Sequence, residues 1–179
     1  MHLNFQSKIL DELEQWHRKN PILEEGLELK ELYGKLGFEK NEAARLYLVR
    51  LLDIVQHEGK IKKVGNSWAL SEHTVKIDPK TSEQLDWLEQ LIRNYGMENP
   101  LESEIEEKAI SNKITKDRLK MMLKYLGRQK KLVFFEGEYL HHSVVAKCRS
   151  LLLAELNRKE NGINEKEFRV LINKTKKIV

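Results

Sequence analysis

The apolar positions of this chain follow one plan twice. A stripe of apolar residues at helical spacing runs through residues 42–57, and an equivalent stripe runs through residues 116–128. Each stripe leads into two brief apolar segments around a short turn, "GN" at 65–66 and "EG" at 136–137, as in a β-hairpin. An offset of 71 residues superposes the two copies and pairs Leu48 with Leu119, Leu51 with Met122, Leu52 with Leu123, Val55 with Leu126, Ile61 with Leu132, Val64 with Phe135, and Trp68 with Tyr139.

Two further helices are predicted upstream of the stripe in the first copy. Ser7 is the predicted cap of a helix that ends near Pro21, and a short helix over about residues 28–36 stops at Gly37. The apolar face of the first of these helices consists of Ile9, Leu10, Leu13 and Trp16.

The second copy has the same upstream plan. Thr81 and Gln84 form a predicted capping box for a helix that ends before Pro100. A short helix is predicted over about residues 102–110, and Thr115 is the predicted cap of the third helix. The apolar face of the first helix consists of Leu85, Leu88, Leu91, Ile92 and Tyr95.

Three helices followed by a two-stranded hairpin describe a winged helix. The apolar face of the hairpin, Trp68 in one copy and Phe135 with Tyr139 in the other, is expected to cover the open side of the helices. The predicted fold class is therefore mainly α with small β-hairpins, arranged as tandem winged-helix domains over residues 1–77 and 78–142. The alternative is one continuous helical bundle with incidental hairpins, but equivalent hairpins after equivalent helices argue against it.

A third copy follows and stops early, so residues 143–179 are predicted to be an incomplete winged helix. Its first helix ends with a left-handed cap at "NG" (161–162), and Asn164 and Glu167 form a capping box for a second helix. Only four residues follow Thr175, the candidate cap of a third helix, so we expect a fragment of a longer protein. The apolar positions of the two helices are Cys148, Leu151, Leu152 and Leu156, then Phe168, Leu171 and Ile172.

Charge is distributed unevenly. The net charge is +4, yet residues 144–179 hold nine basic and four acidic residues, so they carry +5 and the remainder carries −1. A basic end on a nearly neutral body suggests a polyanionic partner for that end. A solvated, lysine-rich terminal helix is the alternative, and composition leaves both open.

The sequence argues against a membrane-spanning segment, a secreted protein and the common catalytic and metal-binding motifs. The chain has no apolar run long enough to span a membrane, no signal-peptide pattern, and Cys148 as its single cysteine, so a reduced, cytoplasmic setting is expected. It contains no phosphate-binding glycine loop, no nucleophile elbow, and no histidines at metal-ligand spacing. We therefore predict no catalytic residue, no metal site and no cofactor, and interpret the chain as a binding module rather than an enzyme.

Three segments resemble parts of one protein family. "WHRKNPILEEGLELKELYGKL" (16–36) has an aromatic-His-Arg run, a proline and a glycine before a short helix, and "LVFFEGEYLHHSVV" (132–145) has the form of a wing and its exit. "INEKEFRVLINKTKKIV" (163–179) has a strand-like entry, a Phe-Arg pair, and a small residue with two basic residues. In this order they resemble the second, third and fourth winged helices of the bacterial selenocysteine-specific translation elongation factor, SelB, over essentially the whole chain.

In that family the winged helices form an arm on a GTP-dependent factor, and the last one grips the selenocysteine insertion hairpin of selenoprotein messenger RNA. The resemblance implies that Phe168 is core and that Arg169, Lys176 and Lys177 face the RNA. Lys176 stands where Arg is usual, which reduces a bidentate contact to a point charge, and Val170 replaces a usual Asp. The GTPase part has no counterpart in this sequence, so neither GTP nor tRNA binding is assigned to it.

The basic residues at the end of the chain independently suit the RNA-facing role that the resemblance implies. Lys176 and Lys177 fall at the start of a nascent helix, where free N–H groups and the helix dipole attract phosphate, and Arg169 and Lys174 lie nearby in sequence. The predicted RNA-binding residues are therefore Arg169, Lys174, Lys176 and Lys177. The expected partners are the insertion hairpin and, through the parent factor, the ribosome, with no membrane contact and a monomeric state. The alternative is that these lysines solvate a frayed terminus.

The cations around the hairpins are hypothetical secondary contacts to nucleic acid. Because the first 143 residues carry −1, we expect these cations mainly to protect strand edges, and the complete domains to act as a spacer. Two alternatives stay open: a DNA-binding tandem winged-helix regulator, for which the lysine-rich helix at 116–128 suits a reader, and a scaffold that contacts only proteins. The secondary contacts are Lys62, Lys63, Arg128, Lys130 and Lys131.

Overall fold

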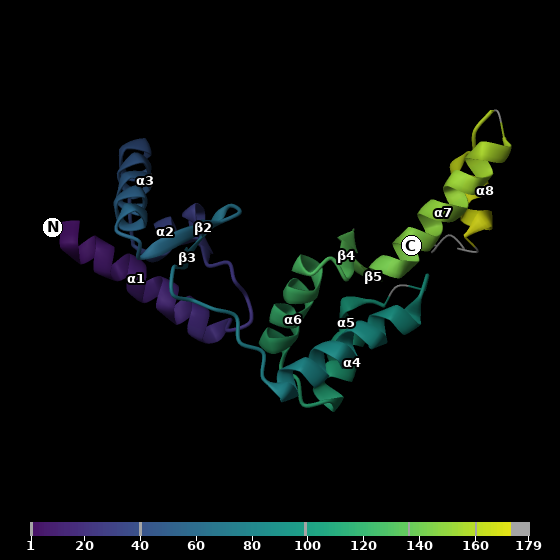
Figure 1. Ribbon diagram of the computed structural model, residues 1–179, viewed down its shortest axis with the longest axis horizontal. Helices are drawn as coiled ribbons and strands as arrows, with labels where there is room; N and C mark the ends of the chain where they lie inside the picture. Colours follow the sequence, from purple (N-terminus) through teal and green to yellow (C-terminus); the bar gives the residue numbers. More distant parts are fainter. Residues whose placement is uncertain (1, 40, 99, 136, 160, 173–179) are drawn as a thin grey trace. The chain divides into compact units, whose positions relative to one another are not determined.

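The computed structural model describes residues 2–39, 41–98, 100–135, 137–159 and 161–172, with only the backbone described at positions 2 and 3 (Figure 1). The chain divides into two compact units, Met1–Ile77 and Asp78–Val179. Each unit is built on its own core and has its own hairpin.

The first unit consists of three helices and a hairpin, with one additional short strand. Its sheet is antiparallel and has the order β1-β3-β2, so β3 is central. The predicted helices at 28–36 and 42–57 and the hairpin that follows them are confirmed. The elements are α1 (His2–Lys19), β1 (Leu27–Glu28), α2 (Leu29–Lys35), α3 (Glu42–His57), β2 (Ile61–Val64) and β3 (Ser67–Leu70).

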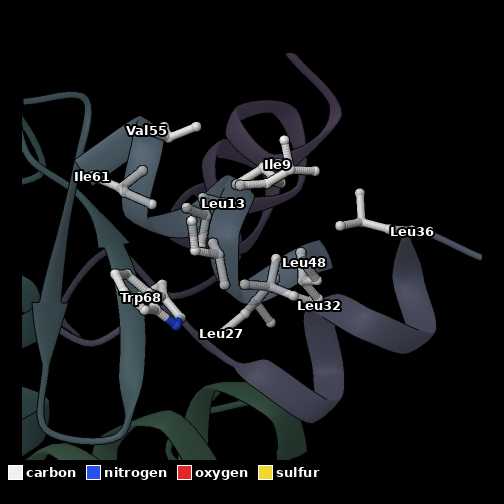
Figure 2. Close-up of a cluster of buried hydrophobic side chains, with 11 residues drawn as sticks. Ile9, Leu13, Leu27, Leu32, Leu36, Leu48, Val55, Ile61 and Trp68 are labelled. Atoms are coloured by element: carbon white, nitrogen blue, oxygen red, sulfur yellow. The ribbon is translucent and has the colours of Figure 1, made fainter. Parts of the chain in front are cut away.

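The core of the first unit lies between its helices and the inner face of the sheet (Figure 2). The predicted stripe on α3 is confirmed, because Leu48, Leu51, Leu52 and Val55 are all buried. Trp68 on β3 is 7% exposed and belongs to the same cluster, as predicted. Burying one such side chain contributes about 1.5–3 kcal/mol, so this layer is the main source of the unit's stability.

The sequence pattern does not predict β1. The strand has only two residues, and Leu27 pairs with Trp68 while Glu28 pairs with Ser67. Gly26 makes the pairing possible, because a Cβ atom there would lie 1.8 Å from the carbonyl oxygen of Trp68. In this unit β1 therefore covers the edge of β3 that β2 leaves open.

The second unit repeats the plan and then continues. Its two-stranded antiparallel sheet is β4-β5, and the predicted helices at 102–110 and 116–128 are confirmed. Thr115 caps the latter as predicted, since its hydroxyl accepts a hydrogen bond from the N–H of Arg118. The elements are α4 (Pro79–Tyr95), α5 (Glu102–Ser111), α6 (Lys116–Arg128), β4 (Leu132–Phe135), β5 (Glu138–His141), α7 (His142–Arg158) and α8 (Glu165–Leu171).

The passage from helix to hairpin is the same in both units. The third helix of each unit ends in an equivalent pair of backbone hydrogen bonds, and each hairpin is closed by an equivalent bond. Each donor and each acceptor in the second unit lies 71 residues after its counterpart in the first, the same offset as in the apolar pattern. The bonds are Gly59 N to Gln56 O, Lys60 N to Val55 O and Ser71 N to Lys60 O in the first unit, and Lys130 N to Gly127 O, Lys131 N to Leu126 O and His142 N to Lys131 O in the second.

Two predicted helix starts are wrong. Helix α1 begins before Ser7, which lies inside it. Helix α4 begins at Pro79 with Asp78 as its N-cap, and the Asp78 carboxylate accepts a 2.9 Å hydrogen bond from the N–H of Thr81. An aspartate cap followed by a proline whose φ already suits the first helical position is a stronger start than the predicted box of Thr81 and Gln84.

Thr81 and Gln84 have a different role. The guanidinium of Arg118 on α6 donates to the Thr81 hydroxyl and to the Gln84 side-chain oxygen, each at 2.8 Å. These polar side chains therefore fasten the start of α4 to α6.

The hairpin of the second unit does not cover its helices in the predicted way. Phe135 is 63% exposed, whereas Leu132 is buried and Tyr139 is half-buried. Leu132 lies at the base of β4, and Phe135, three residues later, points to the opposite face of the strand, so the predicted pair of Phe135 and Tyr139 does not form one face. The residue across from Tyr139 is Phe134.

Helices α7 and α8 are the predicted start of a third winged helix, and neither contains a buried residue. The predicted capping box is confirmed, because Asn164 and Glu167 exchange hydrogen bonds between side chain and backbone. Phe168 is half-buried rather than core, and Leu156 is exposed, because two helices alone cannot enclose a side chain. The predicted cap Thr175 lies outside the described residues.

The fold class is thus mainly α with small antiparallel hairpins, in which three helices and a hairpin occur twice in succession. The finer division of the chain at residues 77 and 142 stays a prediction. Among the described helices none is both long and apolar enough to cross a membrane.

Candidate nucleic-acid interface

Of the four predicted RNA-binding residues, Arg169 alone belongs to the described chain. Lys174, Lys176 and Lys177 lie outside the described residues. Arg169 is on α8, and its guanidinium donates to the carboxylate of Glu165 one turn earlier. An exposed i,i+4 pair of this kind is weak, so a phosphate can displace the carboxylate at little cost.

Acidic side chains surround the beginning of α8. The Glu167 carboxylate accepts hydrogen bonds from the N–H of Asn164 and, at 2.8 Å, from Lys159 Nζ. The hydrogen bond to Glu167 raises the pKa of Lys159, and the same bond lowers the pKa of Glu167. The positive side of α8 is therefore at Arg169, in its last turn, and not at its start.

The cations of the first hairpin are engaged within the unit. Lys62 Nζ lies 3.4 Å from the carbonyl oxygen of His73 and 3.6 Å from the carboxylate of Glu24. Lys63 Nζ stands 5.7 Å from the centroid of the Trp68 ring. Both lysines therefore stabilise the hairpin and its exit, and neither adds to a cationic cluster.

In the second hairpin Lys131 also has a structural partner. Its Nζ lies 2.5 Å from the carboxylate of Glu89 on α4, and His141 Nε2 lies 3.4 Å from the same carboxylate. Burial alone would raise the pKa of Glu89, but hydrogen bonds from Lys131 and His141 hold it below its usual value. The hydrogen bond to Glu89 raises the pKa of Lys131. Lys131 thus joins the hairpin to α4, and its contact with nucleic acid stays a prediction.

Lys130 and Arg128 are exposed at the end of α6. Arg128 is the last of four cations that stand at every fourth position of α6 and form a ridge, and Lys130 follows it. Lys116, the first of the four, pairs with Glu106 at 2.8 Å. The equivalent positions of α3 contain one arginine and, after it, a valine, an aspartate and a histidine. The ridge consists of Lys116, Lys120, Lys124 and Arg128.

The sequence reasoning missed the aromatic tip of the second hairpin. Phe134 is 60% exposed, and its ring centroid lies 4.8 Å from that of Tyr139 on the opposite strand. Phe134 is two residues after the buried Leu132, so the alternation along β4 predicts that it faces inward. Its distance from the helices, which the sequence does not show, leaves it exposed.

A groove of about 580 Å³ opens in the first unit between the beginnings of α2 and α3 and the tip of the hairpin. Both signs of charge line it, and the Glu42 carboxylate accepts hydrogen bonds from Arg45. Such a lining does not favour a polyanion. The residues around the groove are Glu28, Leu29, Lys30, Tyr33, Asn41, Glu42, Arg45 and Asn66. Within the described part of the chain, no group of His, Cys, Asp and Glu side chains is arranged to hold a metal ion.

Comparisons with known proteins give a distant likeness to a solved structure. No protein-family model matches the chain, and no curated protein matches it. Among solved structures, the mRNA-binding domain of elongation factor SelB from E. coli in complex with SECIS RNA aligns with a TM-score of 0.28 and 15% identity, over 76% of this chain and 96% of that one. A likeness at this level carries no functional assignment.

Proposed function

We propose that this chain is an RNA-binding and spacing arm of a selenocysteine-specific translation elongation factor, which holds the factor on the selenocysteine insertion hairpin of selenoprotein messenger RNA. The observation that carries the proposal is the order of units: two winged helices whose hairpins are related by one offset, followed by the capped start of α8 and the segment with the excess positive charge. The three segments that resemble the SelB family fall on these same elements.

The proposed contact is electrostatic and depends on shape. The deep groove of an RNA duplex excludes side chains, so a hairpin is read through its backbone and its unpaired loop bases. Arg169 in the last turn of α8 and the lysines that follow it in sequence supply the cations. The two complete units act mainly as a spacer, and the arm works in the cytoplasm as a monomer that reaches the ribosome through the parent factor. No reaction is assigned to this chain.

The ion pair on α8 provides the test. Glu165→Gln releases the guanidinium of Arg169, so binding of a stem-loop RNA that contains the insertion element should strengthen by about twofold, the equivalent of an exposed helix pair. Arg169→Ala should weaken binding several-fold and flatten the dependence of affinity on salt by about one counterion. Fluorescence anisotropy with the labelled stem-loop at several salt concentrations measures both effects.

The matched control is Arg158→Ala, since Arg158 is an exposed arginine near the end of α7. It should leave affinity unchanged. Equal affinities of all variants, or a preference for duplex DNA over the stem-loop, would contradict the proposal.

A further inference from the structure

We propose that the second hairpin, together with the end of α6, is a separate RNA contact that stacks unpaired bases on Phe134 and Phe135 and holds their phosphates with Lys130 and the cations of α6. This goes beyond a spacing role. It rests on the proposed function only in taking RNA as the polyanion, because the four observations behind it concern this surface alone.

The first observation is the pair of exposed rings. Phe134 and Phe135 are 60% and 63% exposed, and as strand neighbours they point to opposite faces of the hairpin. Phe134 is supported by the Tyr139 ring across the strand pair. Folding does not explain two large phenylalanine rings exposed next to each other on one strand, whereas flat apolar rings suit nucleotide bases of any sequence.

The second observation is the contrast with the first hairpin. The positions equivalent to Phe134 and Phe135 are Lys63 and Val64, and the equivalent of Tyr139 is the buried Trp68. Strand β1 pairs with β3 at that position, with Leu27 opposite Trp68. In the second unit Pro100 precedes Leu101, the N-cap of α5, as Leu27 precedes Glu28, the N-cap of α2. Proline has no N–H for strand pairing, and no third strand is present among the described residues. Among the described residues the outer edge of β5, which carries the Tyr139 ring that supports Phe134, therefore has no further strand beside it.

The third observation is a backbone conformation. Lys130 has a φ of +58°, in the left-handed region, and the equivalent position of the first unit is Gly59 with a φ of +72°. Glycine adopts this conformation freely and lysine does not. Lys113, after α5, adopts the same conformation, so the conformation alone does not mark a site. At Lys130, where the first unit has a glycine, it places a cation at the entry to the aromatic hairpin.

The fourth observation is charge. Residues 116–131 contain seven basic residues and one acidic residue, a net charge of +6, while the equivalent residues 45–60 carry +1. Lys116 and Lys131 pair with Glu106 and Glu89, and the other residues of this segment still carry +4. Glu138, opposite Phe135, is the described carboxylate on the hairpin itself. A polyanion is the partner that complements this helix, and the rings favour unpaired bases over a duplex, in which the bases already stack on one another.

The test uses the whole chain and a fluorescein-labelled oligouridylate of about twelve nucleotides, which has no secondary structure. Phe134→Ala and Phe135→Ala should each weaken binding about fivefold or more, Phe134→Leu should weaken it as much, and Phe134→Trp should retain it, because stacking requires a flat ring. Leu153→Ala removes an exposed apolar side chain from α7 and should change nothing.

Lys130→Gly separates binding from folding. It should weaken binding and flatten its salt dependence while raising the urea midpoint, a combination that a purely structural lysine cannot give. Failure of the wild-type chain to bind the oligouridylate, or wild-type affinity of Phe134→Leu, overturns the inference. So does a loss of self-association in Phe134→Ala with unchanged RNA affinity, which would make this face an interface between copies. Arg169→Ala should leave oligouridylate binding unchanged, so failure of the stem-loop proposal and failure of this one are distinguishable.

Discussion

Gly26 shows how much a single residue decides in the first unit. Its lack of a side chain lets β1 lie against β3, since any Cβ atom would meet the Trp68 carbonyl oxygen at 1.8 Å. The sequence predicts the helix-ending role of Gly37 but not this one, because the contact is made with a strand about forty residues away, and close approach of two backbones leaves no mark on the local pattern.

Gly26→Ala should therefore destabilise the protein by about 3 kcal/mol, because the backbone at Trp68 cannot yield as a flexible side chain would. Urea unfolding followed by tryptophan fluorescence measures the loss. Gly34→Ala is the control: Gly34 lies within α2, nothing stands within 4 Å of its added Cβ, and its replacement should stabilise by about 0.5–1 kcal/mol. Similar effects of the two variants would contradict the close approach.

His17 gives the first unit a dependence on pH. The side chain is buried, its Nε2 accepts a hydrogen bond from the N–H of Leu70 at 3.2 Å, and its ring stacks on that of His73 at 3.7 Å. Burial, with help from the charges of His73 and Lys62, lowers its pKa to about 4. The folded protein therefore holds this imidazole neutral, in the form that can accept from the backbone.

Because the folded pKa of His17 lies below the unfolded value of about 6.5, the unfolded chain takes up a proton first as the pH falls. The stability that neutral His17 provides is fully present above about pH 6.5 and is lost as the pH falls towards about 4, by up to about 3 kcal/mol. Urea midpoints between pH 7.5 and pH 4.5 measure this loss. His17→Gln should remove most of the slope, and His57→Gln, at the exposed end of α3, should retain it; a steep slope in His17→Gln would exclude this origin.

At the level of elements, the repeated stripe predicted α3, α6 and both hairpins, because burial of one helix face is encoded within the helix itself. The errors fall where distant segments or competing signals decide. Asp78 and Pro79 start α4 before Thr81, and Phe135 lies on the face of β4 opposite to the buried Leu132. A run of apolar residues identifies a strand, but when neighbouring positions are all apolar it does not show which of them face the core.

The stripe on α3 leads to a prediction with an internal control. Leu51 is buried and Leu46, on the same helix, is 58% exposed. Leu51→Ala should cost about 2–5 kcal/mol through lost burial and a cavity, whereas Leu46→Ala should change stability by less than about 0.5 kcal/mol. Chemical unfolding of the two variants compares them directly, and equal losses would mean that the helix presents another face to the core.

For the whole molecule, the candidate site was harder to predict than the fold. Lysine content pointed to Lys62 and Lys131, yet both are tied to carboxylates within their own units. Charge counted along a sequence does not reveal which cations already have partners. The exposed aromatic tip of the second hairpin was not predicted either, because alternation along β4 does not show which of its side chains the helices reach.

The first compact unit contains a complete core and sheet, so residues 1–77 alone should fold. We expect a single cooperative unfolding transition for this fragment and a backbone circular dichroism spectrum typical of a helical protein. A fragment that unfolds without cooperativity would mean that the unit draws its stability from the rest of the chain.

The constant offset between the two hairpins has a practical consequence for protein engineering. The backbone hydrogen bonds at the start and end of the two hairpins are equivalent, and the strands pair in the same register. Residues 130–142 can therefore replace residues 59–71 without a change of loop length. Such a chimaera transfers an aromatic tip onto a scaffold that lacks one, and tests by gain rather than by loss whether that tip confers affinity for RNA.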